Sequence, residues 1–176
     1  MRVRLAEKKD YERVVDFYYT LIDKMRGSKY NPIWEKDVYP TRAQLMEAID
    51  GQTLYIGTEK GKIVSAMVLN QKQSEGYDQV KWGVDAPPEK VCVMHMLAVD
   101  PDCAGRGLAV EMTREAVRTA SQRGAQSVRL DVLPGNLPAI GAYTSAGFRY
   151  VATIRISYAD TGLTDFELYE YVIGRG

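Results

Sequence analysis

The chain has 176 residues, of which 45% are hydrophobic and 26% charged, as in an ordinary globular protein. At about 100–200 residues per domain, this length predicts a single domain over residues 1–176. The 23 basic residues balance the 23 acidic ones, so the chain lacks the positive excess typical of proteins that bind nucleic acid or anionic membranes. We therefore expect neither kind of partner.

Cysteine and histidine content narrows the chemistry further. Cys92 and Cys103 are too few for a disulfide framework, and no CxxC pair suggests zinc. A single histidine excludes a multi-histidine metal site. No run approaches the ~18 apolar residues of a membrane span, and the N-terminus shows no signal-peptide pattern. These features predict a reduced, cytoplasmic protein without a bound metal.

Hydrophobic periodicity and turn residues divide the chain into strands and helices. Asp10 is a candidate N-cap for the first helix, and Thr41 with Gln44 fits a capping box for the second. In chain order, we expect a strand at 3–5, a helix at 10–26, a helix at 41–49, strands at 53–59 and 62–70, an irregular segment at 71–90, a strand at 91–99, a helix at 107–123, a strand at 128–133, a helix at 137–146 and strands at 148–158 and 166–173.

This order mixes hairpins with strand–helix–strand crossovers. It predicts an α/β domain with a mixed sheet of about seven strands and helices on both faces. The strand at 91–99 is apolar except for His95, which is typical of a strand buried on both faces.

The segment 99–109 joins that buried strand to a helix through small residues. Unpaired amides and a partial positive charge at the helix start, with glycines at 105 and 107, form the architecture of a phosphate cradle. Leu108-Ala109 stand where a Walker A loop needs Lys-Ser/Thr, and Val110 replaces the last small residue of a dinucleotide fingerprint. The alternative is a plain tight strand-to-helix turn.

Two blocks of residues resemble the GNAT superfamily of N-acetyltransferases, and together they occupy about residues 91–152. The first block is Leu97-Ala98-Val99-Asp100-Pro101 with Gly105-Arg106-Gly107-Leu108-Ala109, and the second is Asp131-Val132-(x)3-Asn136-(x)2-Ala139-Ile140-(x)2-Tyr143-(x)3-Gly147-Phe148. The expected element order also fits the superfamily fold. The resemblance implies a GNAT-like acyl-CoA N-acyltransferase fold, with acetyl-CoA as co-substrate.

The resemblance also implies roles for residues in the first block. Amides from Ala104 to Ala109 would hold the pyrophosphate, and backbone groups of Leu97 to Val99 would pair with the pantetheine arm. An amide near Leu97 would polarise the thioester carbonyl. Superfamily members usually carry Gln or Arg where Ala104 stands, which implies weaker coenzyme A affinity or greater reliance on Arg106.

Three further residues receive roles in the same way. Asn136 would contact the pantetheine region, and Tyr143 would protonate the departing thiolate; the alternative for Tyr143 is a core aromatic residue. His95 stands where many members carry a catalytic Glu, and its imidazole titrates near neutrality, as suits a base. The alternative for His95 is a neutral core histidine bonded to backbone.

Other polar residues are weaker candidates. Asp131 either faces the cleft or pairs with Arg129, and we favour a structural role. The irregular segment offers residues for acceptor recognition, although a solvated loop explains each singly: Glu75, Tyr77, Asp78 and Trp82.

The expected function is acetyl transfer from acetyl-CoA to a primary amine by direct attack in a ternary complex. Cys103 would flank the pyrophosphate, so it is a poor site for a covalent acetyl-enzyme. Two alternatives stay open: a coenzyme A-binding sensor without turnover, and an acetyltransferase acting on a protein N-terminus. The acceptor is a small amine or a peptide, and the resemblance implies a homodimer formed through the strand at 166–173.

Overall fold

The computed structural model describes residues 1–159 and 161–174, which form a seven-stranded sheet and four α-helices. The sheet order is β1-β2-β3-β4-β5-β7-β6, and β4–β5 is the parallel pair. The strands are β1 (Arg2–Leu5), β2 (Leu54–Glu59), β3 (Lys62–Asn70), β4 (Val91–Val99), β5 (Ser127–Val132), β6 (Arg149–Tyr158) and β7 (Gly162–Val172). The helices are α1 (Tyr11–Met25), α2 (Arg42–Asp50), α3 (Leu108–Gln122) and α4 (Leu137–Ser145).

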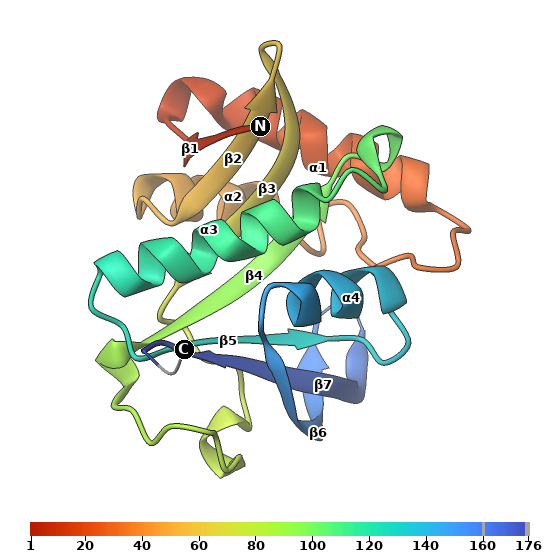
Figure 1. Ribbon diagram of the computed structural model, residues 1–176. Coiled ribbons are helices and arrows are strands. Elements are labelled where there is room, and N and C mark those ends of the chain that lie inside the picture. Colours follow the sequence, from red (N-terminus) through yellow and green to blue (C-terminus); the bar gives the residue numbers. More distant parts are fainter. Residues whose placement is uncertain (160, 175–176) are drawn as a thin grey trace.

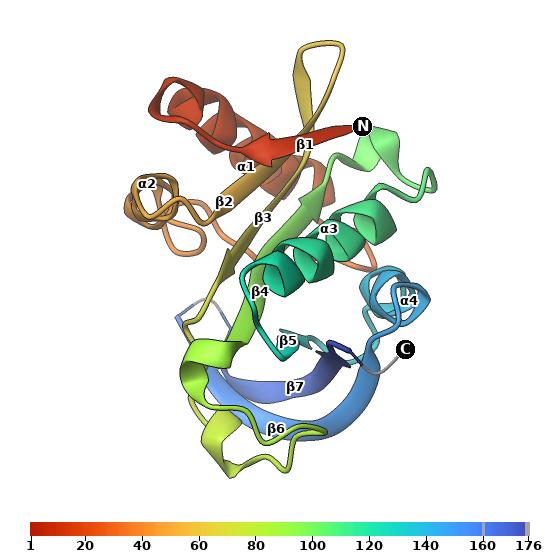
Figure 2. The ribbon, with the colours of Figure 1, turned by 60° about the vertical axis from the view of Figure 1, so that its left-hand side comes forward.

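Helices cover both faces of the sheet, as the sequence predicts. Figures 1 and 2 show α1 and α2 on one face of β1–β4 and α3 on the other, with α4 beside β5. The helices bury separate apolar clusters, in which Val14 and Leu45 belong to one face and Met112 and Ala116 to the other. No helix in the described part of the chain is long and apolar enough to cross a membrane.

The two predicted helix caps differ in outcome. Thr41 and Gln44 form the expected capping box, each side chain bonding the other's backbone amide. Asp10 precedes α1, but its buried carboxylate caps no amide of that helix. It accepts hydrogen bonds from the Arg4 guanidinium (2.6 Å) and the Glu7 amide (3.0 Å) instead. The Arg4 ion pair turns Asp10 towards β1 and away from the helix start.

β4 is not buried along its whole length, contrary to the prediction. Residues 91–94 are buried, but most of the strand beyond is only half-buried. The reason is that β4 pairs with β5 only from Val91↔Ser127 to Val93↔Arg129. Beyond that point the two strands diverge, as Figure 1 shows, and a cleft opens between their carboxyl ends.

A β-bulge lies in the diverging part of β4. The pairing with β3 shifts register between Ala66 and Val68, opposite Ala98 and His95. Met96 takes a positive φ of 53°, a conformation that costs a non-glycine residue about 1–2 kcal/mol. The bulge re-aims the backbone of β4 where it borders the cleft.

The strand proposed from sequence as a dimer edge is not an edge. β7 lies between β5 and β6, since β7 pairs with both, and the terminal strands of the sheet are β1 and β6. In the β6–β7 hairpin, the second strand, β7, therefore pairs with β5 in the interior of the sheet, and the first strand, β6, forms the edge. A homodimer stays a prediction, and β6 is the strand at that end which has a free edge.

Candidate active site

A cavity of about 710 Å³ lies where β4, α3 and α4 meet. Its walls include Leu97 and Val99 from β4, and Asn136 and Tyr143 from the α4 region. The segment before and into α3 contributes Cys103, Ala104, Gly105, Gly107, Leu108, Ala109 and Val110. The structure thus brings most of the predicted coenzyme A-binding residues to one cavity.

The start of α3 presents unpaired amides to this cavity. Gly105 and Gly107 both adopt φ of 75°, and no other atom lies where a β-carbon would stand at either position. The Ala104 amide donates to the Pro101 carbonyl (3.1 Å), so it is already bonded. The amides from Gly105 to Val110 have no acceptor in the described part of the chain. This arrangement suits a phosphate group.

Arg106 does not line the cavity. Its guanidinium forms an ion pair with Glu59 on β2 (2.8 Å), which draws the side chain away from the helix start. Among the described residues, no charged side chain lines the cavity. Any anion bound there would therefore depend on backbone amides and the helix dipole.

A second cavity, of about 140 Å³, adjoins the first. It lies between β4 and β5, where the two strands no longer pair, and its lining includes His95 and Asp131. Leu97, Asn136, Ala139 and Tyr143 line both cavities. The two spaces therefore meet at these four residues.

Tyr143 lies at the junction, on the inner face of α4. Its ring packs against Phe148 and Tyr169, with ring centroids 6.3 and 6.4 Å apart. Burial, and secondarily the negative charge of Asp131, raises the pKa of the Tyr143 hydroxyl. No described residue bonds this hydroxyl, yet no buried side-chain oxygen in the described ranges lacks a partner. The hydroxyl oxygen is therefore accessible from the cavities, as a protonated donor.

His95 faces the second cavity from β4, with its tautomer fixed by its neighbours. Nε2 lies 3.0 Å from the Lys72 carbonyl and 3.1 Å from Asn70 Oδ1, and that oxygen also accepts from the Lys72 amide. Because both partners are acceptors, Nε2 carries the hydrogen and Nδ1 keeps the lone pair. Burial lowers the pKa of His95, although the Asp131 carboxylate opposes the shift.

Asp131 also lines the second cavity, one of the two placements expected from sequence, and it does not pair with Arg129, which was the other. Its Oδ2 accepts from the Tyr77 and Tyr158 hydroxyls, over 2.7 and 2.8 Å, and lies 3.3 Å from Ser74 Oγ. A carboxylate held on one oxygen by hydroxyl groups has a fixed orientation. Asp131 thus belongs to the site.

The segment 71–90 contacts the site indirectly, through a hydrogen bond to Asp131. None of its four candidate residues lines the second cavity, and Glu75 and Asp78 are exposed. Tyr77 acts through its bond to Asp131, and Trp82 bonds the Tyr77 carbonyl (2.7 Å).

Arg129 anchors this segment to the sheet. Its guanidinium bonds Glu170 (3.1 Å) and stacks over the Trp82 ring at 4.2 Å, while Glu170 also accepts from the Gly83 amide (2.6 Å). The pair is buried and well bonded, which fixes the loop against β5 and β7.

The aromatic walls of the second cavity are absent from the sequence prediction. Trp34 and Tyr39 come from the loop before α2, and Tyr158 and Phe166 come from the β6–β7 hairpin. No local motif marks these residues, because distant segments bring them together.

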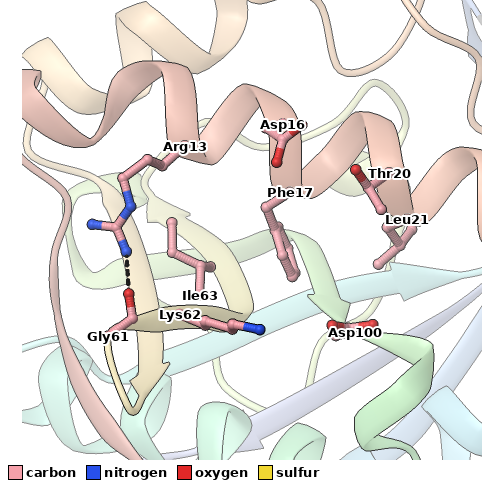
Figure 3. A pocket seen from close by; sticks show the side chains of 9 residues that line it. All are labelled: Arg13, Asp16, Phe17, Thr20, Leu21, Gly61, Lys62, Ile63 and Asp100. Atoms are coloured by element: carbon pink, nitrogen blue, oxygen red, sulfur yellow. Dashed lines mark hydrogen bonds between the residues drawn. The ribbon is translucent and has the colours of Figure 1, made fainter.

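A third hollow, of about 330 Å³, lies between α1 and the β2–β3 turn (Figure 3). Arg13 donates to the Gly61 carbonyl (2.6 Å), and Asp100 accepts from Lys24 (3.0 Å). It contains none of the residues predicted to bind coenzyme A or to act in catalysis. Its charged groups at these two positions are paired, so we do not place the active site there.

Known proteins resemble this chain in part of its sequence and in its fold. The chain is 40% identical over 60 residues to mycothiol acetyltransferase of Saccharomonospora viridis, a match that spans 34% of this chain and only 20% of that protein. A GNAT-family acetyltransferase structure from Streptococcus agalactiae superposes with a TM-score of 0.80 at 18% identity, covering 99% of this chain and 96% of that one. The Salmonella typhimurium protein yncA with its cofactor acetyl-CoA superposes with a TM-score of 0.73 at 15% identity, covering 100% and 95%.

The family model described as "Acetyltransferase (GNAT) family" matches residues 17–148, from within α1 to the end of the second motif block. This range contains the cradle before α3, the bulged strand β4 and Tyr143 on α4. The chain belongs to the GNAT acetyltransferase family.

Proposed function

We propose that this protein transfers an acetyl group from acetyl-CoA directly to a primary amine. The observation that carries the proposal is the junction of the two cavities at Leu97, Asn136, Ala139 and Tyr143. The larger cavity has the unpaired amides that suit a pyrophosphate, and the smaller has the imidazole. A thioester reaching the junction from one side would meet an amine arriving from the other.

Acetyl-CoA is the acetyl donor that the family uses, and the larger cavity suits it. Amides from Gly105 to Val110 would hold the pyrophosphate. The edge of β4 beyond Val93 is unpaired on the β5 side, so Leu97 and Val99 are free to bond an extended pantetheine arm. Asn136 caps α4 through its side-chain oxygen, 3.4 Å from the Ala139 amide, which leaves its amide nitrogen for the ligand.

The reaction needs a base, since an alkylamine is mostly protonated at neutral pH. His95 Nδ1 would accept the proton that the attacking nitrogen loses. The lowered pKa of His95 keeps the imidazole neutral and ready for this role. As the new C–N bond forms and the C–S bond breaks, the Tyr143 hydroxyl would supply a proton to the thiolate. Its raised pKa keeps the phenol protonated up to alkaline pH.

The test combines titration calorimetry of the protein with acetyl-CoA and a thiol-release assay. The acceptors are a panel of primary amines and a panel of peptides with free N-termini. Binding together with thiol release from amines is the expected result. Binding without release from any acceptor would overturn the enzyme in favour of a sensor, and release from peptides alone would overturn the small-amine acceptor. Absence of binding would overturn the cradle.

We also propose a reducing, cytoplasmic location. Its support is that Cys92 and Cys103 are both free thiols in the structure.

A further inference from the structure

The second cavity is small, has aromatic walls and contains a single negative charge among the described residues. Its volume of about 140 Å³ is about a fifth of the 710 Å³ of the first cavity. Trp34, Tyr39, Tyr158 and Phe166 provide aromatic surface. Asp131 is its one charged side chain among the described residues, because His95 is neutral and no lysine or arginine lines it.

The free oxygen of Asp131 is available to a ligand. All the hydrogen bonds of this carboxylate go to Oδ2, so Oδ1 has no partner in the described part of the chain. No buried side-chain oxygen in those residues lacks a partner, so Oδ1 is accessible to solvent. Among the cavities described above, the second is the one that Asp131 lines, so an ammonium group bound there would have this oxygen as an acceptor.

Among the described residues, the second cavity itself contains no cation to balance a carboxylate on the acceptor. Lys72 lines an adjoining hollow, beside His95, but its ammonium is bonded to Glu47. A carboxylate on the acceptor would therefore lie near Asp131 without a partner of opposite charge. Unmatched like charges in a confined site are strongly unfavourable.

We infer that the acceptor is a small primary amine with an aromatic or apolar body and no carboxylate, and that Asp131 selects it by binding its ammonium group. This inference rests on the proposed function and names its substrate class. After binding, the ammonium gives one proton to His95 Nδ1, and the free amine attacks the carbonyl carbon of the thioester. As the C–S bond breaks, Tyr143 gives its proton to the departing sulfur and regains one from the acetylated nitrogen, while His95 releases its proton to solvent. Amino acids, which carry a carboxylate beside the amine, are rejected.

Matched pairs of substrates test the inference: 2-phenylethylamine against phenylalanine, and tyramine against tyrosine. We expect kcat/KM to be at least about 100-fold higher for the amine of each pair. Phenylalaninamide, which lacks the carboxylate charge, should recover most of the difference. Equal kcat/KM within each pair, or a preference for the amino acid, would overturn the inference.

The substitution Asp131→Asn tests the assigned residue, and Asp78→Asn, at an exposed acid outside the cavity, is its control. Asp131→Asn should lower kcat/KM for the amines about 10- to 100-fold, chiefly through KM, and shrink the preference over amino acids. An unchanged preference in a folded Asp131→Asn protein would overturn the role of Asp131. If that variant fails to fold, the wild-type pairs decide. Thiol release from no amine at all, despite acetyl-CoA binding, would instead overturn the proposed function, and this inference with it.

Discussion

The hydroxyl of Tyr18, on α1, donates a 2.8 Å hydrogen bond to the carbonyl of Met96, the residue with positive φ in the β4 bulge. Tyr18 is fully buried, and burial raises the pKa of its hydroxyl, which therefore stays a donor. A helix packed against the sheet thus holds the strained peptide that borders the cleft.

Removing this bond should disturb both stability and turnover. Tyr18→Phe leaves the Met96 carbonyl without its donor, at a cost of about 1–3 kcal/mol in the free energy of unfolding. The bulge should then relax, and kcat should fall while acetyl-CoA still binds. Urea unfolding and steady-state kinetics measure the two effects. Tyr11→Phe is the control, because its exposed hydroxyl makes only a 3.4 Å bond to the Arg42 carbonyl. Equal behaviour of the two variants would deny Tyr18 this role.

Tyr143→Phe removes the proposed proton donor while keeping the ring that packs against Phe148. We expect kcat to fall by roughly 10²- to 10⁴-fold, the range for loss of a general acid. The dissociation constant for acetyl-CoA should hardly change, as calorimetry would show. Tyr169→Phe is the control, since the Tyr169 hydroxyl donates to Glu167 and Tyr169 lines neither cavity. A Tyr143→Phe enzyme with full turnover would remove Tyr143 from the mechanism.

The pH profile reports on His95. Because burial lowers its pKa below the ordinary 6.5, the imidazole stays neutral down to mildly acidic pH. Wild-type kcat should therefore fall on acidification through a pKa below 6.5. The sign for stability is the same: the folded state binds this proton less tightly than the unfolded chain, so stability is lost as pH falls below about 6.5.

His95→Gln should lower kcat and remove that acidic inflection, measured from pH 5 to 9 with both substrates saturating. The acidic limb of the unmutated enzyme serves as the reference. A glutamine variant whose profile runs parallel to that of wild type would leave His95 a structural residue only.

Gly107→Ala tests the cradle. Its φ of 75° costs an alanine roughly 1–2 kcal/mol in stability, and this strain falls on the segment that carries the unpaired amides. We expect a lower melting temperature and an acetyl-CoA KM raised about tenfold or more. Gly61→Ala is a matched control, because Gly61 has a φ of 77° and open surroundings in the β2–β3 turn. It should lose similar stability and keep its KM; a raised KM in both variants would argue for a general effect of strain.

Local patterns predicted the sheet, the helices and the cradle. The capping box at Thr41 and the turn at Gly105 and Gly107 depend only on residues a few positions away, so the sequence alone is enough to predict them. Asp10 shows the limit of such local prediction: it precedes the helix as a capping residue would, but its carboxylate is bonded to Arg4 of β1. A tertiary ion pair thus outweighs the local preference for capping.

The acceptor side of the site was mostly beyond reach of the sequence. Asp131 has its hydroxyl donors at Tyr77 and Tyr158, which are 54 and 27 residues away along the chain. Arg129, the expected partner of Asp131, forms its ion pair with Glu170 on β7. This pairing depends on the strand order β5-β7-β6, and no short sequence motif predicts that order.

The narrow seam between β4 and β5 has a thermodynamic consequence. In the described part of the chain, only three residue pairs join the strands β1–β4 to the strands β5–β7. The line along which the sheet has the fewest pairs therefore runs beside the two cavities proposed to bind the substrates. A ligand lying against β4 and α4 at once acts as a clamp across this line. At 100 times its dissociation constant, such a ligand adds about 2.7 kcal/mol to the free energy of unfolding. The ligand-free enzyme should therefore exchange its amide hydrogens fastest along the seam, and acetyl-CoA should slow that exchange on both sides together.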